Sequence, residues 1–510
     1  MIDRASGGLA ASILLGAASA FAFEPVGWWP LMLLAFAALC RLIERAPSLG
    51  RALLLGWGFG VGQFVVGLNW IATAFTYQAK MPAWLGWVAV VLLALYLAVY
   101  PMLAAGLAWR WGRARPLALV LALSGGWAVT EWLRGTMFTG FAWNPVGVVF
   151  ADTFVRDTSA WIGTYGLSAL AVLVGGALFM AARRELKGAA ALIAPLALLT
   201  GLAGQPRPGF TETRVRIVQP NIGQADKWRP GFDRIAADRL AGLTARPGGA
   251  AADIVLWPEA AVTRPLVDER LAASGLVEAE RRRALRSIAP GQLLITGGLA
   301  FTSSDGLEVD GATNSVFVLA RDRRVGGRYD KAHLVPYGEY LPMRPLLGAI
   351  GLSRLAPGDL DFRPGPGPRT LALPGGLKMG VQICYEIIFP GGVVEPGKRP
   401  DVLFNPSNDA WFGAWGPPQH LAQARLRAAE EGLPVLRSTP TGISAVIDAR
   451  GALIASLGMG VAGVIDRPLP AALPPTPFAR LGNVIPLTLA FLLVVAAIVL
   501  GRSPRYSADI

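Results

Sequence analysis

Long apolar stretches dominate the first 205 residues of the chain and return once near its C-terminus. They fall at roughly 7–23, 27–43, 52–75, 83–108, 116–134, 159–182, 189–205 and 481–501. Each stretch has close to the length of about 20 apolar residues that a helix needs to cross a bilayer. The pattern therefore predicts about eight transmembrane helices, seven of them before a long hydrophilic segment and one after it.

The first apolar stretch has two interpretations. It follows Arg4 and ends in ASAFAFEP, a combination that is also typical of a cleaved signal peptide. We favour an uncleaved first helix, because seven further stretches follow it and because the distribution of basic residues requires it.

From about residue 213 the long apolar stretches give way to short apolar runs separated by polar residues. Short runs typical of strands follow one another, and several of them are apolar on consecutive positions, as expected of strands with both faces buried. These runs are TRVRIVQ, DIVLWP, QLLITGGLA, NSVFVLA, KMGVQIC, DVLFN, PVLRS and SAVID. FDRIAADRLAGLTA and QHLAQARLRAAEEG have helical apolar spacing between them, and Gly432 closes the second. This alternation predicts one α/β domain over 213–470, between a membrane domain over 1–212 and a C-terminal helix and tail over 471–510.

Composition and charge agree with a membrane protein. The chain is 53% apolar and 16% charged, and its net charge of +13 would suggest nucleic acid in a soluble protein. The basic residues instead cluster at the ends of apolar stretches, so no nucleic-acid partner is expected. One set of connections and ends carries Arg4, Arg41, Arg45, Arg51, Arg110, Arg113, Arg115, Arg183, Arg184, Lys187, Arg502 and Arg505, whereas the opposite short connections carry Lys80, Arg134 and Arg156. By the positive-inside rule both termini are cytoplasmic and the α/β domain lies outside the cytoplasm.

Two polar features lie inside the apolar stretches. The run GWGFGVG invites comparison with a nucleotide-binding loop, but it has no preceding strand, so we assign it to close helix packing. Glu131 and Arg134 are three residues apart on a predicted helix, which favours a mutual ion pair near the outer interface. The alternative is that this pair shapes a lipid-headgroup site, since polar groups at membrane depth are costly.

Three residues of the α/β segment could together supply catalytic chemistry. Cys384 ends the run KMGVQIC, Glu259 stands in LWPEAA, and Lys331 stands in RYDKAHLVPYGEYLP. A thiol, a carboxylate and an ammonium provide a nucleophile, a general base and a cation for an oxyanion, which is the equipment for acyl transfer through a thioester. Each residue alone has an ordinary alternative, since most cysteines are inert core and most Glu and Lys side chains are solvated.

The scarcity of cysteine and histidine narrows the chemistry. Cys40 lies in a predicted span, so Cys384 is expected to stay a free thiol. The chain has only His333 and His420, which makes a zinc site implausible, and we expect no metal and no cofactor. Two histidines are enough for a His–Cys dyad, which the count alone does not exclude. His333, however, follows Lys331 by two residues and would share its face of a strand, so we treat it as secondary.

Together with their flanking sequences, Glu259, Lys331 and Cys384 resemble the Glu–Lys–Cys triad of the nitrilase, or carbon–nitrogen hydrolase, superfamily. The apolar helices on both sides of the segment and the phrase PYGEYLP narrow this resemblance to the apolipoprotein N-acyltransferase family, along essentially the whole chain. The resemblance implies a multi-span helical membrane domain and an extracytoplasmic nitrilase-like domain with a four-layered α-β-β-α sandwich. It also implies transfer of an acyl chain from a phospholipid, through a Cys384 thioester, to the N-terminal amine of S-diacylglyceryl-cysteine on apolipoproteins.

The resemblance assigns supporting roles to further residues. Glu339 matches the second glutamate of nitrilase-type sites, and Tyr385 and Glu386 follow the nucleophile directly. Trp228, Trp411 and Phe412 would contact acyl chains or close the pocket, although they could equally anchor the domain at the membrane interface. The expected acyl donor is a phospholipid, with phosphatidylethanolamine foremost, in a bacterial inner membrane.

Two other functions compete with this one. A membrane-tethered carbon–nitrogen hydrolase would use the same acyl-enzyme, so the triad does not separate the two. A non-catalytic membrane scaffold with a degenerate nitrilase-like domain is disfavoured, because all three chemical groups stand in motif context. The eight apolar stretches favour a lipid donor, since a soluble amide would not need them.

Overall fold

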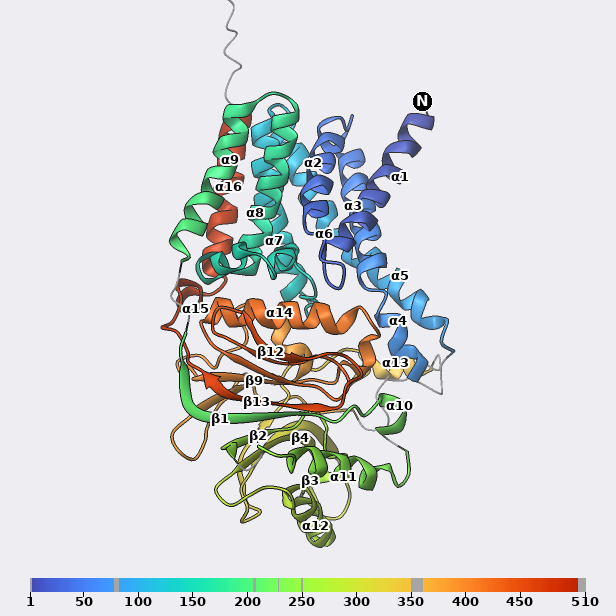
Figure 1. Cartoon of the computed structure of the whole chain (residues 1–510). Coiled ribbons are helices and arrows are strands. Elements are labelled where there is room, and N and C mark those ends of the chain that lie inside the picture. Colours follow the sequence, from blue (N-terminus) through green and yellow to red (C-terminus); the bar gives the residue numbers. More distant parts are fainter. Residues whose placement is uncertain are drawn as a thin grey trace, which may run out of the picture. The chain divides into compact units, whose positions relative to one another are not determined.

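The computed structural model describes residues 2–77, 82–204, 208–227, 229–248, 251–349 and 361–502. The chain forms two compact units. The helical unit comprises residues 1–69, 87–205 and 475–510, and the sandwich unit comprises residues 70–86 and 206–474. Figure 1 shows the elements of each unit, which are described separately below.

The helical unit contains a helix for each of the eight predicted apolar stretches. Its principal helices are α1 (Ile2–Ser19), α2 (Pro30–Glu44), α3 (Leu49–Gly67), α5 (Leu85–Leu97, which begins in the sandwich unit), α6 (Val99–Gly112), α7 (Pro116–Thr136), α8 (Ser159–Ala182), α9 (Leu186–Leu202), α15 (Pro477–Leu481) and α16 (Val484–Arg502). Among the described residues, five helical stretches are long and apolar enough to cross a membrane: Leu49–Gly67, Leu85–Gly112, Pro116–Thr136, Phe154–Ala182 and Val484–Arg502. Gly7–Ala22 and Leu186–Leu202 are apolar but shorter.

The glycines of GWGFGVG let α3 pack closely against two neighbours, as predicted. A Cβ at Gly62 would lie 2.0 Å from the Ile13 carbonyl oxygen of α1, and one at Gly56 would lie 2.6 Å from the Pro101 carbonyl oxygen of α6. Only a residue without a side chain permits such backbone approach, which is the usual packing device of membrane helices.

The predicted span over 52–75 was too long, because α3 ends at Gly67. The apolar residues that follow form α4 (Ile71–Ala74) and the 3₁₀ turn η2 (Phe75–Tyr77), and residues 70–86 belong to the sandwich unit. The Trp70 ring packs edge-on against Phe412, with their centroids 4.7 Å apart. Hydropathy alone did not distinguish residues that face lipid from residues that pack in a protein core.

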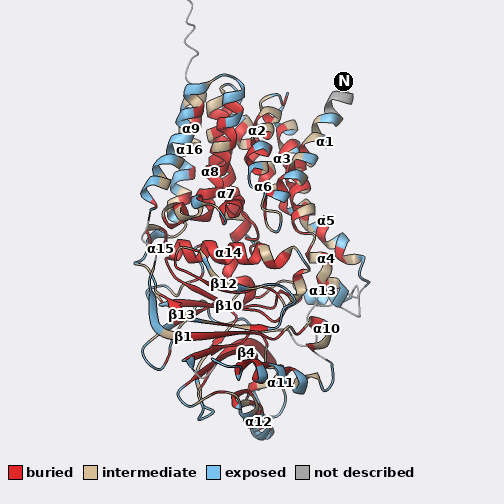
Figure 2. Ribbon diagram, viewed as in Figure 1, coloured by how far each residue is buried: buried red, intermediate tan, exposed pale blue. Residues whose placement is uncertain are grey.

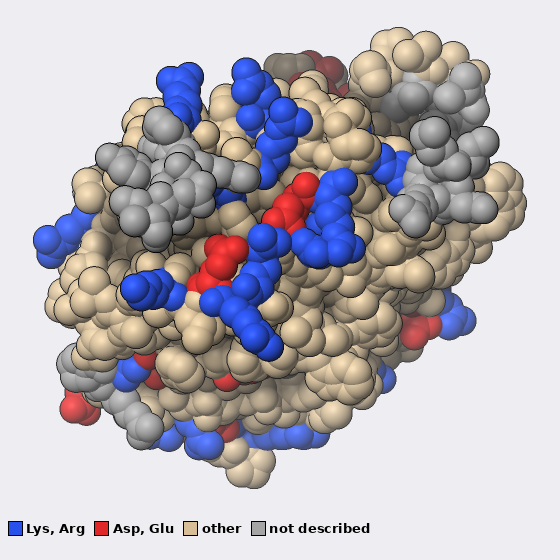
Figure 3. All heavy atoms as spheres, turned by 90° about the horizontal axis from the view of Figure 1, so that it is seen from above, with Lys and Arg blue, Asp and Glu red and all other residues tan. Residues whose placement is uncertain are grey.

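The basic connections gather at one end of the helical unit. The last residue of α2, Glu44, forms an ion pair of 2.8 Å with Arg183, which directly follows α8. Trp109 Nε1 of α6 donates to the Ala46 carbonyl, just after α2, at 2.8 Å. Figure 3, viewed down onto this end, shows many Lys and Arg side chains and few acidic ones. The basic residues at this end are those that the sequence placed in one set of connections.

The sandwich unit contains two sheets. The seven-stranded sheet has the order β13–β1–β2–β4–β5–β6, with β3 paired to β4, and the six-stranded sheet has the order β12–β11–β10–β9–β8–β7. The strands are β1 (Phe210–Gln219), β2 (Ile254–Leu256), β3 (Pro265–Asp268), β4 (Leu293–Thr302), β5 (Gly311–Leu319), β6 (Val325–Asp330), β7 (Thr370–Ala372), β8 (Lys378–Val381), β9 (Val402–Pro406), β10 (Val435–Ser438), β11 (Ser444–Ile447), β12 (Leu453–Leu457) and β13 (Gly463–Pro470). All eight predicted strands are present, whereas β3, β6, β7, β12 and β13 were not predicted.

Helices cover the two outer faces of the paired sheets. The helices α11 (Phe232–Thr244) and α12 (Ser274–Leu285) pack on the seven-stranded sheet around a core that includes Val218, Leu240, Val255, Leu285 and Phe317. The helix α14 (Gly416–Glu431) packs against β10 of the other sheet and ends at Gly432, whose φ is +64°. Ser438 Oγ of β10 donates to the Val218 carbonyl of β1 at 3.0 Å, which joins the sheets face to face. The unit is therefore the predicted α-β-β-α sandwich, and Figure 2 shows both sheets largely buried.

Candidate active site

Cys384 begins a strained turn at the end of a strand. It follows β8, which runs parallel to β9, and it starts the 3₁₀ helix η7 (Cys384–Ile388). Its φ is +53°, a left-handed conformation that non-glycine residues seldom adopt, and its side chain is buried. Strain of this kind persists only where the surroundings impose it, and it is common at active sites.

Glu259 reaches the same region from the other sheet. It follows β2, and the next residue, Ala260, has a φ of +45°. The bend presses the chain against β4, where a Cβ at Gly297 would lie 2.5 Å from both the Pro258 oxygen and the Ala260 nitrogen. Gly297 in QLLITGGLA is therefore required for the Glu259 backbone to take this path.

Lys331 lies directly after β6, held between two carboxylates. Its Nζ is 2.9 Å from Glu339 Oε2, 3.0 Å from Glu339 Oε1 and 3.7 Å from Glu259 Oε1. Glu339, which could have been an exposed loop acid, is buried, and its Oε2 also accepts from the Val335 N–H at 2.8 Å. The structure thus brings Glu259, Lys331 and Glu339 into one buried cluster.

Asn314 of β5 completes this cluster and was missed from the sequence. Its Nδ2 donates to Glu259 Oε1 at 2.7 Å and to Glu339 Oε1 at 3.0 Å, which orients both carboxylates. Glu259 Oε2 is buried and has no hydrogen-bond partner among the described residues. A buried carboxylate oxygen without a partner is costly, and it is free to accept a proton. No pattern in the sequence pointed to Asn314, because an Asn in an apolar strand is not a catalytic motif.

The charges of the cluster set its resting state. Burial raises the pKa of the Cys384 thiol, Glu259 raises it further, and Lys331 partly opposes this rise. For Lys331 burial disfavours the charge, but Glu339 and Glu259 outweigh it and hold the pKa above its ordinary value. The resting site therefore contains a neutral thiol and a cation, so the thiol needs a base to become a nucleophile.

Glu386 links the turn that contains Cys384 to the end of β6 by hydrogen bonds. Its Oε1 accepts from Tyr329 Oη and the Ala332 N–H, both at 2.8 Å, and from the His333 N–H, while its Oε2 accepts from the Ile383 N–H at 2.7 Å. Burial raises its pKa to about 7 against these hydrogen bonds. Glu386 thus connects the turn of Cys384 to the segment that carries Lys331.

Tyr385 and His333 belong to an aromatic group beside the turn. The Tyr385 ring centroid is 5.7 Å from that of His333 and 5.2 Å from that of Phe389. The prediction that His333 shares a strand face with Lys331 was wrong, because β6 ends at Asp330. Glu386 accepts the backbone N–H of His333, and this turn directs its ring to Phe389 instead.

Lys227 is a second buried cation at the site, and the sequence did not single it out. It ends α10 (Gln224–Lys227), and its Nζ donates to the Glu259 carbonyl at 3.1 Å. Burial lowers its pKa to about 8, although Glu259 and Cys384 favour the charged form. Trp228, the next residue, lies outside the described residues.

Trp411 and Phe412 lie on the 3₁₀ turn η8 (Asp409–Phe412). Phe412 is buried between Trp70 and His420, with ring centroids 4.7 and 5.8 Å away. Trp411 is less buried and meets Tyr77 edge-on at 5.7 Å. Phe412 therefore packs in the sandwich unit, while Trp411 lies nearer its surface.

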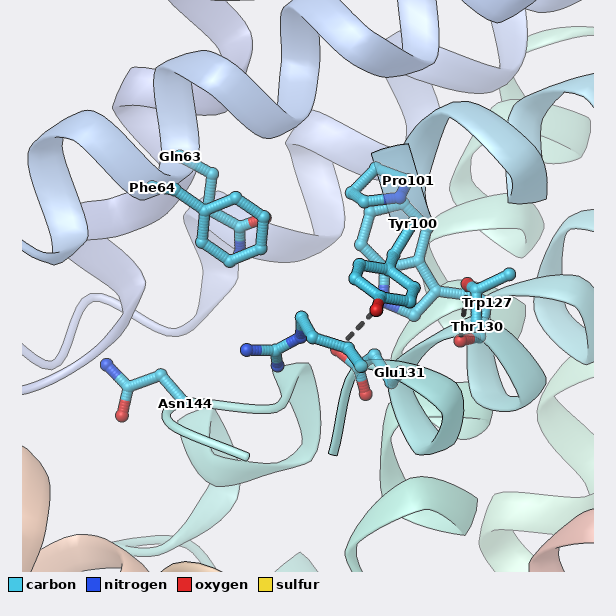
Figure 4. Close-up of a pocket in the computed structure, with 9 residues that line it drawn as sticks. Gln63, Phe64, Tyr100, Pro101, Trp127, Thr130, Glu131 and Asn144 are labelled. Atoms are coloured by element: carbon cyan, nitrogen blue, oxygen red, sulfur yellow. Dashed lines mark hydrogen bonds between the residues drawn. The ribbon is translucent and has the colours of Figure 1, made fainter. Parts of the chain in front are cut away.

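The polar pair in the helical unit has a structural role. Arg134 donates to the Phe141 and Trp143 carbonyls at 3.0 and 2.8 Å, and Glu131 accepts from the Trp127 indole and the Val146 N–H at 3.0 and 2.8 Å. The hydrogen bonds of both side chains thus fix the irregular segment after α7. Figure 4 shows the small pocket around Glu131, whose cavity of about 10 Å³ is room for one water. A cavity of this size gives no support to a lipid-headgroup site.

Comparisons with known proteins cover both units. Residues 15–177 match the family described as apolipoprotein N-acyltransferase N-terminal domain, and residues 214–473 match carbon-nitrogen hydrolase. A Caulobacter vibrioides apolipoprotein N-acyltransferase is 39% identical, covering 94% of this chain and 92% of the relative. Proteins of the same name from Rhodopseudomonas palustris and Bradyrhizobium diazoefficiens are 35% and 36% identical, each covering 97% of this chain and 95% of the relative.

Proposed function

This chain belongs to the apolipoprotein N-acyltransferase family. We propose that it transfers an acyl chain from a lipid to lipoproteins through a thioester on Cys384. The observation that carries this mechanism is the buried Glu259 Oε2, which has no hydrogen-bond partner among the described residues and belongs to the same cluster as Lys331. A free carboxylate oxygen, a neutral thiol and a fixed cation divide the roles of base, nucleophile and oxyanion stabiliser.

The first half-reaction forms the acyl-enzyme. Glu259 takes the proton of the Cys384 thiol, and the sulfur forms a bond to the ester carbonyl carbon of a phospholipid. The negative charge moves to the carbonyl oxygen, where Lys331 Nζ and the Tyr385 N–H stabilise it. The bond to the glycerol oxygen then breaks, Glu259 returns its proton to that oxygen, and the lysophospholipid leaves.

The second half-reaction makes an amide. The neutral α-amine of an S-diacylglyceryl-cysteine attacks the thioester carbon, and the same two groups stabilise the second oxyanion. The carbon–sulfur bond breaks, and the amine proton passes by way of Glu259 to the departing thiolate, which regenerates the thiol. An α-amine with a pKa of about 8 is partly neutral at physiological pH, so this step requires no strong base.

The membrane arrangement belongs to the same proposal. All eight apolar helices would span the bacterial inner membrane, with both termini cytoplasmic and the nitrilase-like domain on the periplasmic side. The proposed domains are a membrane domain over 1–212, a catalytic domain over 213–470 and a C-terminal helix and tail over 471–510. The concentration of basic residues at one end of the helical unit supports this orientation. Phosphatidylethanolamine is the proposed donor.

Mass spectrometry of the purified protein after incubation with phosphatidylethanolamine vesicles tests the first half-reaction. A mass increase of one acyl chain is expected, and Cys384→Ser should not retain it as a thioester labile to hydroxylamine. No acyl-enzyme in the unmodified protein would overturn the mechanism.

Discharge of that acyl-enzyme separates a transferase from a hydrolase. A diacylglyceryl-cysteinyl peptide should remove the acyl group and become N-acylated, whereas an N-acetylated peptide should not. Loss of the acyl group to buffer at the rate seen with the peptide would favour the carbon–nitrogen hydrolase alternative.

A further inference from the structure

His420 makes a buried contact with the backbone of the nucleophile. It lies on α14, its side chain is fully buried, and its Nε2 is 3.0 Å from the Cys384 carbonyl oxygen. The proposed mechanism does not use this histidine, which is separated from Cys384 by 36 positions along the chain. The contact is made to the backbone oxygen of Cys384.

A buried ion pair fixes the other side of the imidazole ring. Asp409 Oδ1 is 3.1 Å from His420 Nδ1, and Arg437 Nη2 donates to both Asp409 oxygens at 2.7 Å. Arg437 also bonds to Asn405 and Ser407 at the end of β9. All these side chains except that of His420 come from the strands β9 and β10 or the turn that follows β9, so the ring is held by the six-stranded sheet.

The surroundings determine the hydrogen-bonding form of His420. Burial lowers its pKa and the Arg437 cation lowers it further, and together they outweigh Asp409 and the Cys384 carbonyl, which raise it; this favours a neutral ring. A neutral ring with the proton on Nδ1 would leave Nε2 facing the Cys384 oxygen, two acceptors in contact. With the proton on Nε2, the ring donates to Cys384, and Nδ1 accepts from Arg437 Nη2 at 3.1 Å. In this form Nδ1 also lies 3.1 Å from Asp409 Oδ1, a carboxylate oxygen whose charge is neutralised by Arg437.

The contact is made to a residue whose backbone is strained. Cys384 has a φ of +53°, and its carbonyl receives the His420 bond and a longer one of 3.4 Å from Asn405 Nδ2. The Cys384 carbonyl and the Tyr385 N–H belong to one planar trans peptide, so they point in opposite directions. Fixing the oxygen therefore fixes the direction of the N–H.

We propose that His420 is a positioning residue which, by donating to the Cys384 carbonyl, aims the Tyr385 N–H at the developing oxyanion. It acts through the peptide plane and does not take the thiol proton. This inference rests on the proposed function, because it assigns the Tyr385 N–H to the oxyanion. If the imidazole only filled space in a buried network, the acylation rate would not depend on which of its ring nitrogens a substitution preserves.

Two amide variants separate these roles. The Gln side chain of His420→Gln can present an N–H where Nε2 lies, whereas that of His420→Asn reaches only to the place of Nδ1. Each full-length variant in detergent is given a p-nitrophenyl acyl ester, whose attack by Cys384 creates an oxyanion, and separately iodoacetamide, whose reaction needs the thiolate but creates no oxyanion. The activated ester reports on the site whatever the natural lipid donor is.

The expected result is selective. His420→Asn should slow burst acylation by the ester about ten- to a hundredfold, because a misdirected donor loses part of its oxyanion stabilisation. His420→Gln should stay within about threefold of the unmodified protein, and all three should react with iodoacetamide at similar rates. If His420→Asn does not accumulate as folded protein, His420→Met, which fills the space without donating, takes its place.

Three outcomes would contradict the proposal. Equal acylation in all variants would show that the contact has no effect, and parallel loss of acylation and alkylation would make His420 a base or a purely structural residue. Slow acylation in both amides with normal alkylation would show that the imidazole, and not its donated bond, matters. If the unmodified protein reacts with the activated ester but with no phospholipid, the proposed function fails while the role of His420 stands.

Discussion

The ammonium of Lys331 lies 2.9 Å from Glu339 Oε2, and both side chains are buried. The distance from Lys331 to Glu259 Oε1 is longer, 3.7 Å. Glu339 therefore takes most of the cation's attraction, and Glu259 keeps one oxygen without a partner among the described residues. In the proposed mechanism, this division of charge lets Glu259 act as a base beside a lysine that would otherwise hold it in an ion pair.

Replacing Glu339 should reveal this division. In Glu339→Gln, Lys331 loses its main counter-charge and should move toward Glu259, which weakens Glu259 as a base. We expect thioester formation with phosphatidylethanolamine vesicles to slow about tenfold or more, measured by mass spectrometry over time. Glu308→Gln, at an exposed position of the same unit, is the control. Acylation of Glu339→Gln at the unmodified rate would show that Glu339 only fills space.

Substitutions in the triad should stop acylation without unfolding the protein. Cys384→Ala should form no thioester, and Glu259→Gln and Lys331→Ala should each lose about a hundredfold or more in acylation rate. Thermal melting checks the fold of each variant, since Lys331→Ala leaves two buried carboxylates without their cation. Retained acylation in a folded Lys331→Ala would make the lysine structural only.

Lys227 should give acylation a pH dependence of its own. Its lowered pKa of about 8 means that it is charged below pH 8 and neutral above it, so its support for the Cys384 thiolate is present at neutral pH and is lost as pH rises. The ratio of acylation rates between the unmodified protein and Lys227→Met should therefore fall as pH increases through 8. Lys378→Met, at an exposed lysine of β8, serves as control. A ratio that does not change between about pH 6.5 and 9.5 would contradict a role for the charge.

The proposed orientation can be tested by reporters. A periplasm-active reporter joined after residue 212 should be active, and one joined after residue 505 should be inactive. Labelling of a cysteine placed at the exposed Ser304 by a membrane-impermeant maleimide should also occur from outside, in a Cys40→Ser, Cys384→Ser background. Labelling only after the membrane is permeabilised would show that the domain lies on the cytoplasmic side, where it could not meet a periplasmic acceptor.

Several features of the fold could be predicted because they depend on local order in the chain. Apolar length predicted the positions of all eight helices, and fully apolar runs such as 254–256 predicted strands buried on both faces. The strands that were missed, such as β12 and β13, are part-exposed and have weak patterns, and their pairing with neighbours makes them strands. The extent of the third apolar stretch was wrong because residues 70–77 pack in the other unit.

The sequence by itself determined the apolar character of the helices, the places of eight strands in the α/β segment and the residue types of Glu259, Lys331 and Cys384, since these are properties of composition, spacing and motif. Only the tertiary structure decided which groups meet. Asn314, Lys227 and His420 stand in ordinary strand and helix sequence, and they acquire their contacts because two sheets and α14 bring distant segments together. A hydrogen bond depends on distance and direction in space, and a linear pattern carries neither for residues far apart in the chain.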